Sequence, residues 1–249
     1  MDEVNEAATV GFGAASDAYE RGRPSYPPAV IGVLTGDLGV GPGRRVLDLA
    51  AGTGKLTRLL VPTGADVVAV EPVAAMREQM QSAVPGVEVL EGTAEAIPLP
   101  DGSVDAVTAA QAFHWFRPGQ ALAEIRRVLR PSGGLLLVWN ERDVSVPWVA
   151  AVSEVIDWDG RRPYEKGTDW AEVVADAGGF TPLQQRRIRF EHEVDEETLV
   201  DRMLSTSYVA AGSDEERREV EAGVRAVVAG FPERFALPYV TDIFWCTRD

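Results

Sequence analysis

Short apolar runs alternate with amphipathic segments between residues 45 and 139. A continuous apolar run of about four to eight residues, bounded by Gly and Pro, is typical of a strand buried on both faces of a parallel sheet. The runs predict strands at Arg45–Leu49, Asp66–Val70, Val87–Leu90, Val104–Ala109 and Leu135–Trp139. The intervening segments predict helices at about Lys55–Val61, Val73–Ala83 and Pro118–Leu129. This alternation indicates an α/β fold with a doubly wound parallel sheet and right-handed crossovers.

The flanking regions add helices and two more strands. A helix is predicted at about Ala29–Leu38, because Pro28 suits a first helical turn. Further predicted elements are helices at Pro147–Ile156 and Asp169–Ala177 and strands at Gln184–Phe190 and Tyr239–Thr247. Residues 195–231 are helical in pattern, with a capping box at Ser213 and Glu216, and they are longer than an ordinary connection. We therefore predict a Rossmann-like, mostly parallel seven-stranded sheet with a helical cap. Its parts are an N-terminal lid segment (1–40), a core (41–195), the cap (196–231) and the final core strand (232–249).

The turn after the first strand, Asp48-Leu49-Ala50-Ala51-Gly52-Thr53-Gly54, carries the strongest chemical signal. We call it the glycine turn. Its glycines allow backbone N–H groups to approach a ligand closely, and a second acid, Glu71, ends the next strand 23 residues after Asp48. In a βαβ unit such an acid can accept both hydroxyls of a ribose. The spacing therefore predicts a nucleoside cofactor.

Two kinds of nucleotide site fit this turn poorly. A phosphate-binding P-loop needs a Gly and a Ser or Thr where this chain has Leu49 and Leu56. A dinucleotide site needs a third small residue where Thr57 stands, and Asp48 would repel a pyrophosphate. A nicotinamide-dependent oxidoreductase is disfavoured for the same reasons. A cofactor with no phosphate and a positively charged end suits these residues better.

Further motifs accompany the glycine turn. They are Gly92-Thr93-Ala94-Glu95, Phe113-His114-Trp115-Phe116, Arg130-Pro131-Ser132-Gly133-Gly134 and Tyr19-x-x-x-Arg23-Pro24-x-Tyr26-Pro27. Together with Asp48-x-Ala50-x-Gly52-x-Gly54 and Glu71, they resemble the class I S-adenosylmethionine (SAM)-dependent methyltransferases. The likeness is to the small-molecule type 11 group, which includes trans-aconitate and ubiquinone/menaquinone-biosynthesis methyltransferases. It covers about residues 19–140 and departs at Ala51, where the family more often has Cys.

The resemblance implies SAM as cofactor, S-adenosylhomocysteine as its product, and a role for each matched residue. The implied cofactor-binding residues are Asp48, Ala50, Gly52, Thr53, Gly54, Glu71, Pro72, Met76, Ala94, Glu95, Gln111 and Arg23. The glycine turn would receive the methionine part of SAM, with Asp48 orienting the turn or the amino group. Glu71 would bind the ribose from outside the core. Pro72 and Met76 would pack on the adenine, Ala94 and Glu95 would read its edge, and Gln111 would lie near the sulfonium.

Some of these residues have a second interpretation. Glu95 either reads the adenine edge or caps the residues that follow it. His114, a candidate catalytic residue, is either a general base or a packed, hydrogen-bonded imidazole. Arg142 either holds a carboxylate or forms a surface ion pair with Glu141 or Asp143. The candidate substrate pocket comprises Tyr26, Trp115, Arg142, Trp148 and Tyr208, with Tyr164 as a further wall.

Composition narrows the class of partners. The net charge of −15 argues against a nucleic-acid substrate, since proteins that read phosphates show a basic face. No run of 18 apolar residues predicts a membrane span, and the acidic N-terminus does not resemble a secretory signal, so we expect a cytoplasmic protein. Cys246 is the single cysteine, and no cluster of Cys or His predicts a metal site.

These observations favour a SAM-dependent methyltransferase that transfers a methyl group to an O, N or C atom of a small molecule, such as a carboxylic acid. The alternative is a regulatory or scaffold protein that binds SAM without turnover, since a fold does not by itself imply activity. The sequence leaves the acceptor and the oligomeric state open.

Overall fold

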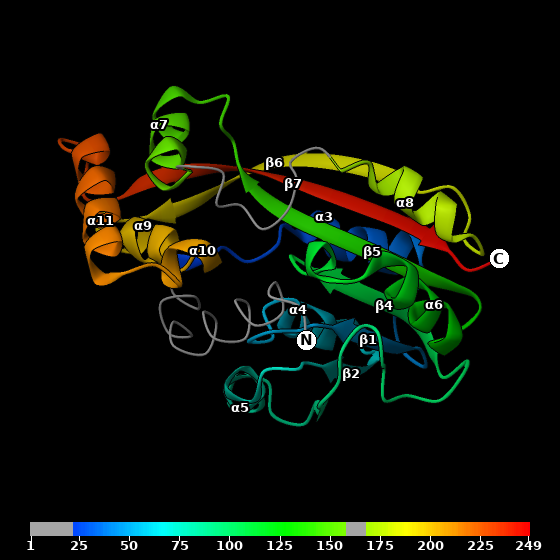
Figure 1. Ribbon diagram of the computed structural model, residues 1–249. Helices are drawn as coiled ribbons and strands as arrows, with labels where there is room; N and C mark the ends of the chain where they lie inside the picture. Colours follow the sequence, from blue (N-terminus) through cyan, green and yellow to red (C-terminus); the bar gives the residue numbers. More distant parts are fainter. Residues whose placement is uncertain (1–21, 158–167) are drawn as a thin grey trace. The chain divides into compact units, whose positions relative to one another are not determined.

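The computed structural model describes residues 22–157 and 168–249 (Figure 1). These residues divide into two compact units. The sheet unit comprises residues 25–139, 168–188 and 241–249, and the cap unit comprises residues 22–24, 140–157 and 189–240. Residues 1–21 of the predicted lid segment, and Tyr164, lie outside the described residues.

Seven strands form one sheet in the order β3-β2-β1-β4-β5-β7-β6. They are β1 (Arg45–Leu49), β2 (Asp66–Val70), β3 (Glu88–Leu90), β4 (Val104–Ala110), β5 (Leu129–Arg142), β6 (Gln184–Val194) and β7 (Phe235–Thr247). The pairs β1–β2, β1–β4, β2–β3 and β4–β5 are parallel. The strand order reverses between β1 and β4, and open α/β sheets bind ligands at the carboxyl ends of strands beside such a reversal. The predicted mostly parallel, seven-stranded, Rossmann-like sheet is confirmed.

Helices connect these strands in both units. The sheet unit contains α3 (Pro28–Gly32), the π-helix η1 (Val33–Asp37), α4 (Thr57–Leu60), η2 (Val61–Thr63), α5 (Ala74–Ala83), η3 (Phe113–Trp115), α6 (Pro118–Val128) and α8 (Trp170–Ala177). The cap unit contains α7 (Pro147–Ile156), α9 (Glu196–Leu204), α10 (Ser207–Ala210) and α11 (Asp214–Val228). Local chemistry explains several starts: α6 and α7 have Pro in the first turn, and the predicted capping box of Ser213 and Glu216 opens α11.

Strand β5 is longer than the apolar run Leu135–Trp139 predicted. It begins at Leu129, and its pairing with β4 shifts register between Val104 and Ala106. A Cβ on Gly133 would lie 3.0 Å from the Asp105 carbonyl oxygen, and one on Gly134 would lie 2.8 Å from the Leu38 side chain. The two glycines therefore permit close packing inside an irregular strand.

Alternation along the strands buries both faces of the sheet. Leu47 of β1 belongs to one apolar cluster, which includes residues of α6 and α8, whereas its neighbour Val46 belongs to a second cluster with residues of α3 and α4. The sheet is thus held between two helical layers.

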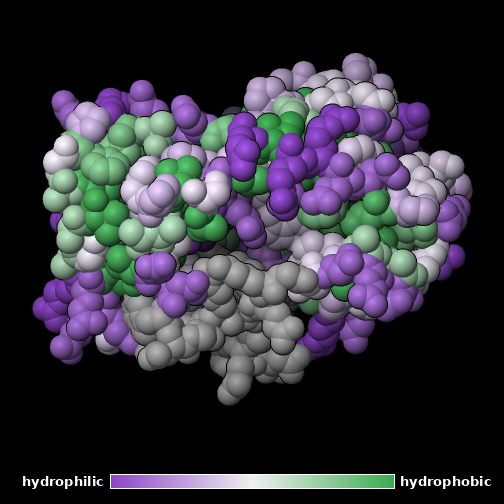
Figure 2. Space-filling model, turned by 90° about the horizontal axis from the view of Figure 1, so that it is seen from above, coloured by the Kyte–Doolittle hydropathy of each residue, from purple (hydrophilic) through white to green (hydrophobic). Residues whose placement is uncertain are grey.

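The cap unit has an apolar cluster of its own. Leu199 of α9 and Val224 of α11 are buried with residues of α7 and with Tyr239 of β7. A Cβ on Gly223 would lie 2.8 Å from the Val155 side chain, so glycine allows α11 to approach α7 closely. Polar side chains cover much of the surface visible in Figure 2, in keeping with 39 acidic residues against 24 basic ones.

Candidate functional site

Backbone conformation sets the glycine turn apart. Ala50, Gly52 and Gly54 all have positive φ, at 54°, 57° and 82°. Gln111, which follows β4, also has a positive φ, of 57°. Left-handed conformations are rare for residues other than glycine, and they cluster at functional sites. Ala50 and Gln111 follow the neighbouring strands β1 and β4, so two of the three described non-glycine residues with positive φ lie at the carboxyl edge of the sheet. The third, Ser132, lies near the start of β5.

Asp48 is the first residue of this turn and is only 1% exposed. Its Oδ2 accepts a hydrogen bond from the Thr57 hydroxyl at 2.5 Å, and its Oδ1 accepts one from the Thr108 hydroxyl at 3.0 Å. Burial raises the pKa of Asp48 to about 6, although the two hydroxyl groups act in the opposite direction. The carboxyl group thus links β1 to α4 and to β4, which fixes the two ends of the turn.

Glu71 faces the other side of the glycine turn. Its Oε2 accepts the Gly52 N–H at 2.9 Å, and its Oε1 accepts the Val73 N–H at 2.9 Å. The residue is 4% exposed, so the expectation that it lies outside the core is wrong: it stabilises two backbone turns from a buried position. Burial raises its pKa, against the effect of these two N–H groups and of Arg77. A carboxylate has about four acceptor positions, so two remain for ligand hydroxyls.

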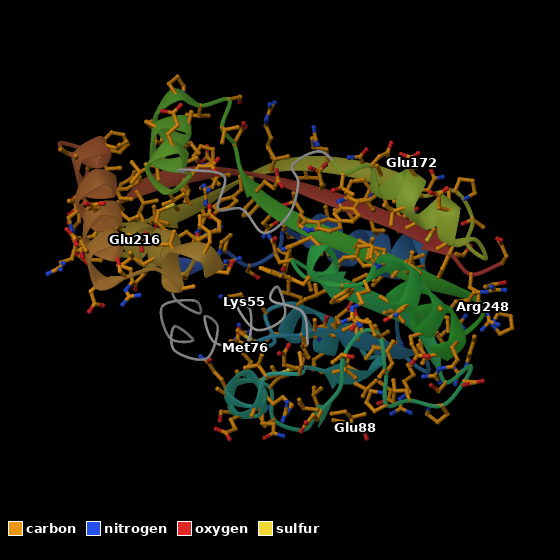
Figure 3. The ribbon with its side chains drawn as sticks, viewed as in Figure 1. Lys55, Met76, Glu88, Glu172, Glu216 and Arg248 are labelled. Atoms are coloured by element: carbon orange, nitrogen blue, oxygen red, sulfur yellow. The ribbon has the colours of Figure 1, made fainter. Side chains whose placement is uncertain are left out.

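Helix α5 borders the turn. Met76 is buried, and its Sδ would lie 3.8 Å from a Cβ on Gly52, whereas Pro72 is exposed. Figure 3 labels Met76 on α5 and Lys55 at the end of the turn. A Cβ on Gly54 would lie 2.9 Å from Met80 Cγ. Gly54 is therefore required by packing within the protein, and Gly52 mainly by its backbone conformation.

The segment after β3 contains Ala94 and Glu95, the two residues predicted to read the adenine edge, and both side chains contact other parts of the protein. The Ala94 side chain is buried in the apolar cluster of β1 and α6, so only its backbone can read a ligand edge. Glu95 Oε1 accepts the Arg117 N–H at 2.9 Å. Arg117 is the N-cap residue of α6, so Glu95 binds the start of α6 and not the residues that directly follow it.

His114, which follows β4, is held by the side chain of Trp139 in β5. The Trp139 indole N–H donates to Nδ1 of His114 at 3.1 Å, and Trp139 stacks on Trp170 with ring centroids 5.1 Å apart. An indole N–H can only donate, so Nδ1 must accept, and the neutral imidazole then carries its proton on Nε2. Trp115 lies beside the His114 ring, with centroids 5.2 Å apart.

The remaining predicted residues belong to different units. Tyr26 lies in the sheet unit and packs on the cluster of α3 and α4. In the cap unit, Arg23 Nη2 donates to the Ser205 carbonyl at 3.3 Å and Arg142 Nε donates to Ser153 Oγ at 3.0 Å. Asp143 is paired with Arg189 at 3.0 Å.

Two aromatic candidates lie within the apolar cluster of the cap unit. Trp148 packs edge to face on Phe231 and Phe235, and Tyr208 packs against the same cluster. Among the described residues, a cavity of about 300 Å³ opens in this unit, lined by Asp195, Glu196, Glu197, Val228, Phe231, Pro232, Glu233 and Phe235. None of the predicted site residues lines it.

Sequence reasoning missed the groups that hold the site residues. Thr108 was an available signal, because it is a hydroxyl residue within an apolar strand and pairs with Asp48 across β1 and β4. In the sequence, Thr57 is interpreted only as a residue that does not fit a dinucleotide-binding motif, and its bond to Asp48 is not predicted. The bond between Trp139 and His114 joins residues 25 positions apart, and no local pattern reveals it. Within residues 22–157 and 168–249, no group of three or more His, Cys, Asp or Glu could hold a metal, and no helix is long and apolar enough to cross a membrane.

Comparison with known proteins identifies the family. The methyltransferase domain family matches residues 47–137. Over 238 residues the chain is 43% identical to the uncharacterized methyltransferase Rv3342 of Mycobacterium tuberculosis, covering 94% of this chain and 93% of that protein. It is 39% identical over 134 residues to malonyl-[acyl-carrier protein] O-methyltransferase of Methylococcus capsulatus, covering 51% of this chain and 48% of that protein.

A solved structure from Anaeromyxobacter dehalogenans, provisionally described as a type II methyltransferase, has a TM-score of 0.63 at 28% identity. The match covers 91% of this chain and 97% of that one. Family, relatives and fold agree with the motifs at the carboxyl edge of the sheet. The chain therefore belongs to the class I SAM-dependent methyltransferases, in the type 11 group that its motifs resemble.

Proposed function

We propose that this protein binds SAM at the glycine turn and transfers its methyl group to a small-molecule acceptor. The observation that carries the proposal is the pair of buried acids, Asp48 and Glu71, on either side of a turn with three positive φ angles. The spare acceptor positions of Glu71 suit a ribose diol. Among the described residues, a Cβ on Gly52 would meet nothing closer than Met76 at 3.8 Å, so these residues leave room for a ligand against the backbone of the turn.

The residues at the carboxyl edge fit the charge of this cofactor. When bound, SAM supplies a methyl group activated by a sulfonium. Asp48 and Glu71 place two carboxyl groups near the turn, which favours a cationic ligand and disfavours a pyrophosphate. Methyl transfer is an in-line displacement, and proximity and orientation can supply roughly 7–11 kcal/mol of the barrier reduction. The main task of the chain is therefore alignment.

His114 supports an acceptor that is already ionised. Its Nδ1 lone pair is engaged by Trp139 and its Nε2 carries the proton, so the neutral ring is a donor and not a base. A carboxylate oxygen needs no base to act as a nucleophile. A relative, the malonyl-[acyl-carrier protein] O-methyltransferase, is named for such a reaction. We therefore favour a carboxylic acid as the acceptor and O as the methylated atom.

We keep a small molecule as the partner class, with neither nucleic acid nor membrane, and the cytoplasm as the compartment. The net charge of −15 and the lack of a spanning helix among the described residues support these proposals.

Thermal unfolding with SAM, S-adenosylhomocysteine or NAD tests the cofactor, because a ligand of the folded state raises the melting temperature. We expect stabilisation by the first two and none by NAD, and stabilisation by NAD alone would overturn the proposal. A methyl-transfer screen against small carboxylic acids and their amides then tests the acceptor. SAM binding with no transfer to any acid, phenol or amine would favour the scaffold alternative.

A further inference from the structure

The cap unit contains a buried cation whose partners carry no charge. Arg202 of α9 is 7% exposed. Its Nε donates to the Tyr239 hydroxyl at 3.0 Å, and its Nη1 donates to the Thr206 hydroxyl at 3.3 Å. No carboxylate among the described residues lies within 4.0 Å of it. A guanidinium has five N–H donors, so these two bonds leave most of its capacity unused.

Acidic residues are abundant elsewhere in the same unit. Arg225 of α11 pairs with three glutamates, Glu196, Glu197 and Glu221. The other end of α9 thus supplies two acids to a half-buried arginine, whereas the buried Arg202 receives only hydroxyl groups. A buried charge is normally paired, because removing it from water without a counter-charge is costly. The arrangement points to an anion that the described residues do not provide.

A second guanidinium lies at the same end of α9. Arg23 Nη2 donates to the Ser205 carbonyl at 3.3 Å, and Ser205 is the C-cap residue of α9. The backbone at Gly22 packs closely against α9, since a Cβ on Gly22 would lie 2.5 Å from the Arg202 backbone nitrogen. The partial negative charge of the helix end lowers the cost of gathering two cations. This partial charge forms no hydrogen bond with the remaining N–H groups of Arg202.

We propose that Arg202 binds an oxyanion of the methyl acceptor within the cap unit. The planar fork of Arg matches a carboxylate or a phosphate with two parallel hydrogen bonds. The Tyr239 hydroxyl accepts from Nε and the Thr206 hydroxyl accepts from Nη1, which fixes the guanidinium. Nη2 makes no bond to a described residue, so Arg202 determines specificity for acidic acceptors through this end. The identification of the anion as the acceptor rests on the proposed function, whereas the anion site does not.

Calorimetry on the full chain, with S-adenosylhomocysteine present, tests the site. The probes are succinate, its neutral diamide and inorganic phosphate. We expect succinate or phosphate to bind and the diamide not to bind, and the stronger of the two anions identifies the acceptor group. Arg202→Gln should weaken anion binding at least about tenfold, which corresponds to a loss of about 1.4 kcal/mol. Arg202→Lys should be intermediate. Arg225→Gln removes an arginine already paired with acids and should change nothing.

Equal binding of succinate and its diamide, no binding of either anion, or full anion affinity in Arg202→Gln would each overturn the proposal. Hydrogen exchange on the wild-type chain gives a test that needs no variant to fold. The stronger-binding anion of the two, succinate or phosphate, should slow exchange in residues 202–206, and unchanged exchange at its saturation would contradict the site. The affinity for S-adenosylhomocysteine separates the two claims. If the wild-type chain does not bind S-adenosylhomocysteine, the proposed function is refuted. If it binds S-adenosylhomocysteine but neither anion, only the anion site is refuted.

Discussion

Replacing Asp48 by Asn should stabilise the folded chain at neutral pH, although Asp48 lies at the centre of the candidate site. The Asp48 carboxyl group is 1% exposed, and its partners are two hydroxyl groups and no cation. Burial without a counter-charge disfavours the ionised form. Asparagine has nearly the same shape and carries no charge, so it avoids this cost.

The magnitude follows from the pKa of Asp48, which rises from 3.8 to about 6 on folding. Each unit corresponds to about 1.4 kcal/mol, so ionised Asp48 costs the fold about 3 kcal/mol. In asparagine an N–H₂ group replaces one of the two carboxyl oxygens, so one of the hydroxyl groups loses its acceptor. This loss lowers the free energy of unfolding by about 1 kcal/mol. Asp48→Asn should therefore raise the free energy of unfolding by about 2 kcal/mol at pH 7.5.

The sign of the pH dependence is fixed by the direction of the shift. Because the folded pKa lies above the unfolded one, the protonated Asp48 contributes its full stability below pH 3.8. That contribution is lost as the pH rises through about 6. Urea unfolding of both proteins at several pH values between about 4.5 and 7.5 measures the difference, in which the titration of groups that do not interact with Asp48 cancels. Glu71 does interact with Asp48, so its titration contributes to the difference. The gain in Asp48→Asn should grow through this range.

A difference in unfolding free energy that does not vary with pH would refute this reasoning. Thr108→Val is the matched control, because it removes one hydroxyl donor from Oδ1 and keeps the acid. It should destabilise the chain at pH 7.5, where the carboxylate is ionised, more than at pH 4.5. An effect of Thr108→Val that is the same at both values would show that Asp48 does not ionise in place.

Three further predictions concern the surroundings of the turn. Glu71→Ala leaves the N–H groups of Gly52 and Val73 without their acceptor, so chemical unfolding should show a loss of roughly 2–4 kcal/mol, and an unchanged stability would contradict the buried position of Glu71. Gly54→Ala should lower the melting temperature more than Gly52→Ala, because only its Cβ collides with α5, and the reverse order would contradict this packing. Nitrogen NMR of the imidazole rings should show the proton of neutral His114 on Nε2, and Trp139→Phe should allow the other tautomer; a Nδ1 proton in the wild type would refute the donor assignment.

The part of the fold that the sequence predicts best is the βαβ unit from β1 to β2. The predicted and observed bounds of both strands agree, because each is a continuous apolar run between turn residues. Asp48 and Glu71 could be placed at one edge because the carboxyl ends of parallel strands meet there. These conclusions depend only on local pattern and on the handedness of the connection.

What the sequence could not show depends on register and burial. Thr108 reaches Asp48 across 60 residues because β1 and β4 pair in one particular register. The same local pattern is compatible with Arg202 as an exposed helical residue, since its burial depends on tertiary packing, including the contact with Tyr239. Glu71 belongs to the same class: a strand end is solvated or buried according to the turns that fold over it.

The central claim is that Glu71 holds the ribose of a SAM-type cofactor. The most direct measurement is the affinity of the wild-type chain and of Glu71→Gln for S-adenosylhomocysteine and for its 2′-deoxy analogue, by calorimetry. Glutamine keeps the shape and one acceptor, so the fold should be retained. The account predicts that the wild type prefers the complete ribose by at least about tenfold and that the preference is largely lost in Glu71→Gln. An equal preference for the complete ribose in both proteins, or no binding of S-adenosylhomocysteine to the wild type, would contradict it.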